Sequence, residues 1–220
     1  MPLPPRFSEV SVMAMSEISR DIYAVLPSHL TEGSASPRQM SHLARIALMA
    51  GVQRVGEVGF NTGHSASAFL HSDPNLHVTS FDIGEHDYIG QAKEHVDARY
   101  PGRHHLVIGD SGETLPSYEG DPFDLLFIDG GHAYATAFMD IANGRRVTAE
   151  GAIVIVDDLV PYRRSGFGPS LAWTRAVAAG LVIPRSVHFE LPKSNTRGQK
   201  IGSQAMRLLR LKGWGVGKYK

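Results

Sequence analysis

Acidic residues follow five segments of the sequence that are typical of strands. They are Glu57, Asp82, Asp110, Asp129 and the pair Asp157 and Asp158. The carboxyl ends of parallel strands meet at one edge of a sheet, so these side chains are expected to face one crevice. Aspartate is also common at turns, where it caps backbone amides, and each acid taken singly is compatible with that role. Taken together, the five strand ends indicate a binding or catalytic site.

The first strand end continues into a glycine turn within residues 55–65. Gly59 permits backbone angles that are closed to other residues, and Gly63 would let a ligand approach the main chain. The following helix, capped by Thr62 or Ser65, would offer free N–H groups. The turn therefore predicts the floor of a site for a nucleotide-like ligand.

Asp82 ends the second strand about twenty residues after the turn, where an acid can accept hydrogen bonds from the two hydroxyls of a ribose. A nicotinamide-dependent oxidoreductase would use the same geometry. Its G-x-G-x-x-G pattern would require glycine in place of Asn61 and His64, and here only Gly59 and Gly63 are present. Because a pyrophosphate needs that closer approach, the spacing favours a nucleoside ligand without phosphate.

The elements that must position these residues alternate between strands and helices. The expected strands are 54–58, 77–81, 105–108, 123–128 and 152–156, and the expected helices lie near 63–71, 87–99, 134–146 and 169–180. Residues 125–128 and 153–156 are unbroken apolar runs, which are typical of strands covered on both faces. The alternation predicts an α/β fold with a doubly wound, mainly parallel sheet.

The segment before this alternation is expected to be helical. Apolar spacing within residues 1–36 predicts an amphipathic helix that ends before Pro27. Ser36 and Pro37 are a good N-cap and first-turn pair for a second helix, which Gly51 ends. We expect an N-terminal helical extension ahead of the main fold.

The end of the chain has a different pattern. Residues 186–191 and 205–211 are expected to form an antiparallel hairpin at one edge of the sheet, and the glycine- and lysine-rich residues 214–220 are expected to fray. The expected organisation is a single domain over 1–220, in which 1–36 is the extension and 37–220 the catalytic fold.

Composition narrows the class of partner. The chain has 220 residues, and its 22 Lys and Arg residues balance its 22 Asp and Glu residues, so no net field attracts nucleic acid or an anionic membrane. With no cysteine, disulfides and thiolate metal sites are excluded. No secretory signal or membrane-spanning run is visible. We expect a cytoplasmic protein that acts on a small molecule.

Five pieces of the chain, in order, resemble the motifs of one family. The pieces are residues 57–65, 80–82, 109–111, 127–134 and 151–158. They are similar to those of the class I S-adenosylmethionine-dependent methyltransferases, specifically the small metal-dependent O-methyltransferases of the catechol, caffeoyl-CoA and antibiotic-tailoring kinds. The resemblance implies a Rossmann-like sheet of seven strands and S-adenosyl-L-methionine as cofactor.

The resemblance also implies roles for individual residues. Glu57 and the Gly59–Gly63 backbone would hold the methionine part of the cofactor, Asp82 the ribose, and Asp110 with Ser111 the adenine edge. The full set that it assigns to the cofactor is Glu57, Gly59, Asn61, Gly63, Ser65, Asp82, Asp110, Ser111 and Asp129. For Asp110, an ordinary turn within residues 109–112 is the alternative.

Three acids at the ends of neighbouring strands suggest a metal. Asp129, Asp157 and Asp158 are expected to converge, and packed carboxylates repel one another unless a cation compensates them. Magnesium suits such oxygen ligands, and calcium or manganese would also fit. Similar methyltransferases use corresponding acids as metal ligands, though many have Asn as the third. The alternative is that Asp157 and Asp158 position loops or substrate without a metal.

His132 lies three residues after Asp129, where the catechol-type enzymes carry a lysine base. A neutral imidazole there could take the proton of an acceptor hydroxyl, and its ordinary pKa near 6.5 suits that task. An orienting role or a purely structural turn are the alternatives. With Asp129, it is the predicted catalytic residue.

These inferences predict O-methylation of a small molecule with two adjacent oxygens, such as a catechol-like natural product or a sugar diol. Residues 161–169, with two arginines and two aromatic residues, either form a wall of the acceptor pocket or are an ordinary surface loop. A homodimer is expected, with the leading helix and the edge hairpin as possible surfaces. The rival functions are a nicotinamide-dependent oxidoreductase and a methyltransferase-fold protein that binds the nucleoside without methyl transfer.

Overall fold

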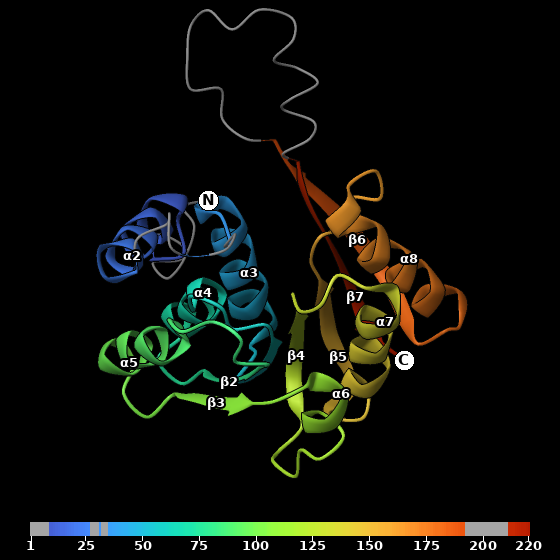
Figure 1. Ribbon diagram of the computed structural model, residues 1–220, viewed down its shortest axis with the longest axis horizontal. Coiled ribbons are helices and arrows are strands. Elements are labelled where there is room, and N and C mark those ends of the chain that lie inside the picture. Colours follow the sequence, from blue (N-terminus) through green and yellow to red (C-terminus); the bar gives the residue numbers. More distant parts are fainter. Residues whose placement is uncertain (1–8, 27–30, 32–34, 192–210) are drawn as a thin grey trace, which may run out of the picture.

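A central sheet of seven strands carries helices on both faces in the computed structural model, which describes residues 9–26, 31, 35–191 and 211–220 (Figure 1). The strands are β1 Arg54–Val58, β2 His77–Asp82, β3 His104–Ile108, β4 Phe123–Ile128, β5 Thr148–Val156, β6 Val182–Glu190 and β7 Lys212–Tyr219. Their order is β3-β2-β1-β4-β5-β7-β6, in which β7 is antiparallel to both of its neighbours. The order reverses between β1 and β4, which defines the switch point of a doubly wound sheet. The predicted α/β fold is confirmed.

The helices form two layers, each with its own apolar core. They are α2 Val12–Val25, α3 Pro37–Ala50, α4 His64–Ser72, α5 Ile89–Arg99, α6 Ser111–Thr114, α7 Tyr134–Gly144 and α8 Arg164–Ala178. Helices α2 to α5 pack on one face and α6 to α8 on the other (Figure 1). Within the described ranges, no helix is long and apolar enough to cross a membrane.

The N-terminal helices form as their sequence patterns predict. Helix α2 buries Met15, Ile18 and Ile22 on one face. In α3, the Ser36 hydroxyl accepts a hydrogen bond from the backbone N–H of Gln39 at 3.1 Å, and this caps the helix start. Both helices thereby join the core beside α4.

The C-terminal segment differs from the prediction. Residues 214–220 were expected to fray, but residues 214–219 belong to β7, which lies between β5 and β6, and Trp214 and Tyr219 are buried. The glycines of this strand have a packing reason, because a Cβ at Gly215 would lie 2.6 Å from Leu159 Cδ1. The antiparallel edge is confirmed, but the expected strand 205–211 lies almost entirely outside the described residues.

Helix α8 begins five residues earlier than the expected start at Pro169, which lies inside the helix. Two glycines allow its first turns to pack tightly on neighbouring loops. A Cβ at Gly166 would lie 2.4 Å from the carbonyl oxygen of Val160, and one at Gly168 would lie 2.1 Å from that of His132. Part of the predicted loop 161–169 is therefore helical.

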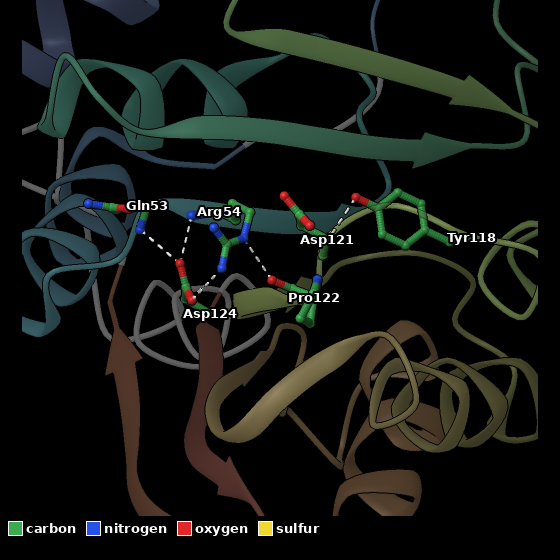
Figure 2. A network of polar contacts seen from close by, with 6 residues as sticks. All are labelled: Gln53, Arg54, Tyr118, Asp121, Pro122 and Asp124. Atoms are coloured by element: carbon green, nitrogen blue, oxygen red, sulfur yellow. Dashed lines mark hydrogen bonds and ion pairs between the residues drawn. The ribbon is translucent and has the colours of Figure 1, made fainter.

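A polar network at the amino ends of β1 and β4 fixes these two strands beside each other (Figure 2). The Asp124 carboxylate accepts hydrogen bonds from the backbone N–H groups of Gln53 and Arg54 at 3.0 and 2.8 Å. The Arg54 guanidinium in turn donates to the carbonyl oxygen of Pro122 at 2.9 Å. The switch point at the opposite end of these strands is thus built on a fixed register.

Candidate active site

A pocket of about 380 Å³ opens at the carboxyl ends of β1, β4 and β5. Of the residues predicted to form the site, it brings together Gly59, Asn61, Ser65, Asp129, His132, Asp157 and Asp158. Other predicted residues do not line it: Glu57, Gly63, Asp82, Asp110 and Ser111. The two groups divide the site into an open part and a set of supporting or peripheral residues.

The glycine turn between β1 and α4 forms one wall of this pocket. Gly59 has φ +92°, and a Cβ there would lie 2.1 Å from the carbonyl oxygen of Asp129, so the turn requires glycine where it meets the end of β4. Gly63 has φ +75° and is the N-cap of α4, which has no side-chain cap. The expectation of Thr62 or Ser65 as cap is wrong, because the Thr62 hydroxyl bonds to His64 Nδ1 at 2.7 Å and Ser65 lies inside the helix.

Asp82 shapes this turn from the neighbouring strand. One carboxylate oxygen accepts hydrogen bonds from the backbone N–H groups of Phe60 and Asn61 at 2.8 and 3.0 Å, and the other accepts one from Gly84 at 2.8 Å. A carboxylate oxygen has two lone pairs, so the oxygen bonded to Gly84 keeps acceptor capacity for a ribose hydroxyl.

Glu57 lies fully buried beneath the turn. Its carboxylate accepts a hydrogen bond from the Ser80 hydroxyl at 2.5 Å, and that hydroxyl also lies 3.0 Å from His104 Nε2. Burial raises the pKa of Glu57 to about 7, and hydrogen bonds from Ser65 and Ser80 only partly oppose this shift. Both the charged and the neutral form of the Glu57 carboxyl group are therefore accessible near neutral pH.

Asp110 and Ser111 make contacts that support their own loop. The Asp110 carboxylate caps the short helix α6 by accepting a hydrogen bond from the Gly112 N–H at 2.7 Å. The Ser111 hydroxyl donates to Asp140 at 2.6 Å, and burial raises the pKa of Asp140 to about 6. The structure shows these contacts, and a role at an adenine edge stays a prediction.

The three acids at the ends of β4 and β5 do converge on the pocket. Asp129 keeps some exposure to the pocket but is otherwise surrounded by protein, and burial followed by repulsion from Asp157 and Asp158 raises its pKa well above its ordinary value. Burial, together with the charge of Asp158, also raises the pKa of Asp157 to about 6. Asp158 has φ +57°, an uncommon backbone conformation that often occurs at functional sites.

Donors within the chain already contact two of these acids. Gln39 on α3 donates its side-chain N–H to Asp157 Oδ2 at 2.6 Å, and the Asp158 N–H donates to Asp157 Oδ1 at 2.8 Å. His132 Nε2 lies 2.7 Å from Asp158 Oδ2, so imidazole and carboxylate form a pair. The close approach of Gly168 to the His132 carbonyl oxygen fixes the backbone of this loop.

The chemistry of this acid set fits a hard divalent cation, since three carboxylates share one pocket. Their present geometry is not that of a finished site. Among the described residues, no three acidic or histidine side chains are arranged to hold a metal ion. Both oxygens of Asp157 accept hydrogen bonds, so a cation would have to share or displace them.

Two residues of the pocket and its supports were missed from the sequence. Lys212 lines the pocket, and Gln39 holds Asp157. Neither lies in a motif of the glycine-turn or strand-end type, and both are far from the acids in sequence. Within residues 161–169, Arg163 and Ser165 line the pocket, which supports the wall interpretation for that part only.

The N-terminal helix also reaches the site. The Ser19 hydroxyl on α2 lies 3.2 Å from His64 Nε2, and the ring of Tyr23 packs against the same imidazole with centroids 4.8 Å apart. Burial lowers the pKa of His64 to about 4, so the ring is neutral at neutral pH. Helix α2 therefore packs directly on the first turn of α4, beside the pocket.

Comparison with known proteins agrees with this geometry. Residues 57–159 match a family described as a methyltransferase domain. The O-methyltransferase hkm8 of Aspergillus hancockii is 27% identical over 193 residues, which cover 86% of this chain and 72% of that protein. The catechol O-methyltransferase of Mycobacterium tuberculosis is 36% identical over 55 residues, or 25% of this chain and 24% of that protein.

Among solved structures, the O-methyltransferase from Bacillus cereus in complex with SAH has a similar fold. Its TM-score is 0.68 at 17% identity, with 100% of this chain and 93% of that chain covered. The sheet order and the pocket at the switch point are those of the class I methyltransferase fold, and residues 57–159 carry the matched methyltransferase domain. The O-methyltransferases among the similar proteins support S-adenosylmethionine-dependent O-methylation, as the family resemblance implied.

Proposed function

We propose that the enzyme methylates a hydroxyl of a small molecule with two adjacent oxygens, such as a catechol-like natural product or a sugar diol. The observation that carries this proposal is the convergence of Asp129, Asp157, Asp158 and His132 on the pocket that the glycine turn also borders. An acceptor in that pocket would lie between the acids and the cofactor. Relatives named O-methyltransferase and catechol O-methyltransferase support the same class of acceptor.

The cofactor is proposed to lie along the carboxyl ends of β1 to β3. The Gly59–Gly63 backbone, Asn61 and Ser65 would contact its methionine part, with Glu57 beneath them, and Asp82 would accept hydrogen bonds from its ribose. Asp110 and Ser111 are proposed at its adenine edge, and Asp129 at the reacting end. Hydrogen bonds from the turn to Asp82 and the close approach of Gly59 to the end of β4 support a fixed frame for these roles.

A divalent cation, with Mg²⁺ as the first candidate, is proposed to assist. Asp129, Asp157 and Asp158 would hold it, and when bound it would lower the pKa of an acceptor hydroxyl and orient it. His132 would then take the hydroxyl proton, and the Asp158 carboxylate 2.7 Å away would stabilise the resulting imidazolium. Placing nucleophile, methyl group and sulfur on a line would supply much of the rate.

Calorimetry with S-adenosylhomocysteine tests the cofactor, and a methyl-transfer assay with catechol and with a vicinal sugar diol tests the acceptor. We expect binding, and transfer that stops in excess chelator and returns with Mg²⁺. Full activity in chelator would refute the metal. Binding without transfer to either acceptor class would instead favour a methyltransferase-fold protein that holds the nucleoside.

A second experiment tests the base. His132→Gln should lower kcat by about 10²-fold or more, as expected for loss of a positioned general base. His105→Gln, on the exposed surface of β3, is the matched control and should leave kcat unchanged. Wild-type turnover of the His132 variant across pH 6 to 9 would reject the role.

The enzyme is also proposed to be a homodimer that uses the outer edge of β6. Ile183, Val187 and Phe189 on this strand are exposed apolar residues at the end of the sheet. Such an edge is prone to pair with another chain. Light scattering of the wild type and of Phe189→Lys checks this: we expect a dimer that the substitution weakens, and a wild-type monomer would refute it.

A further inference from the structure

Lys212 brings a positive charge into the acidic pocket from a segment far away in the sequence. It is the first residue of β7, is only partly exposed, and lines the pocket together with Asp129, Asp157 and Asp158. It thus shares the pocket with carboxylates that repel one another, and the inference drawn from it rests on the proposed metal site.

The charge of Lys212 acts on both sides of the pocket. It lowers the pKa of Asp129 and of Asp157, although burial raises the pKa of both acids more strongly. It also lowers the pKa of His64, at the start of α4. The ammonium group therefore lies within electrostatic reach of the acids and of the helix beside the glycine turn.

The backbone around Lys212 is firmly placed. The Arg163 guanidinium donates a hydrogen bond to the carbonyl oxygen of Leu211 at 3.1 Å, and the Leu159 N–H donates to that of Gly213 at 2.7 Å. A Cβ at Gly213 would lie 2.8 Å from the Leu159 carbonyl oxygen. Both neighbours of Lys212 in the chain are thus tied to the segment that follows the metal-site acids.

We propose that Lys212 is an internal cation of the acidic pocket and that its charge sets how tightly a divalent ion binds there. Hydrogen bonds from Gln39 and the Asp158 N–H reach Asp157, and His132 pairs with Asp158, but three neighbouring carboxylates still repel one another unless a positive charge compensates them. The ammonium compensates the acids when no ion is bound. When an ion of charge +2 enters, the same ammonium repels it, so the site binds the ion more weakly than three carboxylates alone would.

Titration with Mn²⁺, followed by the loss of its free-ion EPR signal, tests the proposal without any activity measurement. Lys212→Met keeps the length of the side chain and removes the charge, and it should bind Mn²⁺ about tenfold more tightly than wild type or better. Lys212→Arg keeps the charge and should stay close to wild type. Lys218→Met is the matched control, because Lys218 is an exposed lysine on the same strand, and it should not change the affinity.

Thermal unfolding with and without Mn²⁺ is a second test, and it includes Lys212→Gln as a second neutral variant. Mn²⁺ should raise the Tm of Lys212→Met and Lys212→Gln more than it raises the Tm of the wild type. Equal Mn²⁺ affinity in wild type and the neutral variants, or weaker binding by the variants, would overturn the proposal. Binding of S-adenosylhomocysteine by each variant reports separately on the cofactor site. If the proposed function is wrong, S-adenosylhomocysteine does not bind; if only this inference is wrong, S-adenosylhomocysteine binds but the Mn²⁺ affinity does not rise in the neutral variants.

Discussion

The buried carboxyl of Glu57 should make the stability of this enzyme depend on pH in an unusual direction. Burial raises its pKa from the ordinary 4.5 to about 7. The folded state then binds a proton more tightly than the unfolded state, so the contribution to the free energy of unfolding is complete below pH 4.5 and is lost as the pH rises through about 7. At 1.36 kcal/mol for each pH unit of difference, the full contribution is about 3 kcal/mol.

The substitution Glu57→Gln isolates this effect. The amide keeps an oxygen that accepts the hydrogen bond from Ser80, but it cannot ionise. Relative to wild type, the variant should gain about 2 to 3 kcal/mol of unfolding free energy between pH 5 and pH 9. Urea unfolding followed by circular dichroism at a series of pH values measures this difference directly. Glu119→Gln, at an exposed position, is the control and should follow the wild-type profile at all pH values.

Two results would refute this reasoning. If the Glu57→Gln and wild-type curves run parallel over that pH range, Glu57 is ionised in the folded protein at all these pH values. If the wild type instead loses stability relative to the variant as the pH falls below 4.5, the pKa of Glu57 is lowered in the folded protein and the sign is reversed. Calorimetry with S-adenosylhomocysteine adds a second readout, because a Glu57 that contacts the methionine ammonium should bind it more weakly as the neutral amide.

Three further predictions follow from the backbone and the strand order. Gly59→Ala should lower the free energy of unfolding in urea by about 3 kcal/mol or more, because a positive φ is combined with a clash, whereas Gly51→Ala, with positive φ but no atom within 4 Å, should lower it by only about 1 kcal/mol. Equal losses would show that the contact with β4 is unimportant. Gly168→Ala should displace the His132 loop and lower kcat about tenfold or more, whereas Gly90→Ala, in α5 with no neighbour within 4 Å, should leave kcat unchanged. Normal turnover of the Gly168→Ala variant would argue against a role for this loop. Ending the chain at Leu211 removes β7 from between β5 and β6 and should abolish cooperative unfolding. A truncated chain with native far- and near-UV circular dichroism spectra would contradict this prediction.

The strands were predictable from the sequence where one local pattern decided the outcome. The apolar runs at 125–128 and 153–156 have no polar position that could face water, so they indicated strands buried on both faces, and β4 and β5 contain them. The acids that follow them converge because parallel strands end at one edge. Local pattern and sheet geometry were sufficient for this part of the site.

Predictions from the sequence were wrong where packing between distant segments determines the secondary structure. Alternating glycines made residues 214–220 look mobile, but Gly215 and Gly217 are needed because side chains of Trp173 and Val182 fill the space beside β7. Pro169 suggested a helix start, but contacts of Gly166 with a neighbouring loop allow the helix to begin earlier. No pattern within one segment reports such contacts.

Side chains from three separate elements interact with the carboxylates of the pocket. Gln39 lies on α3 and donates a hydrogen bond to Asp157, His132 lies on the loop after β4 and pairs with Asp158, and the positive charge of Lys212 on β7 lowers the pKa of Asp129. These donors offset part of the repulsion among the carboxylates without a metal. If a divalent ion assists the reaction, its removal should lower kcat, because the ion would lower the pKa of the acceptor hydroxyl, and it should lower the free energy of unfolding only by the free energy of ion binding.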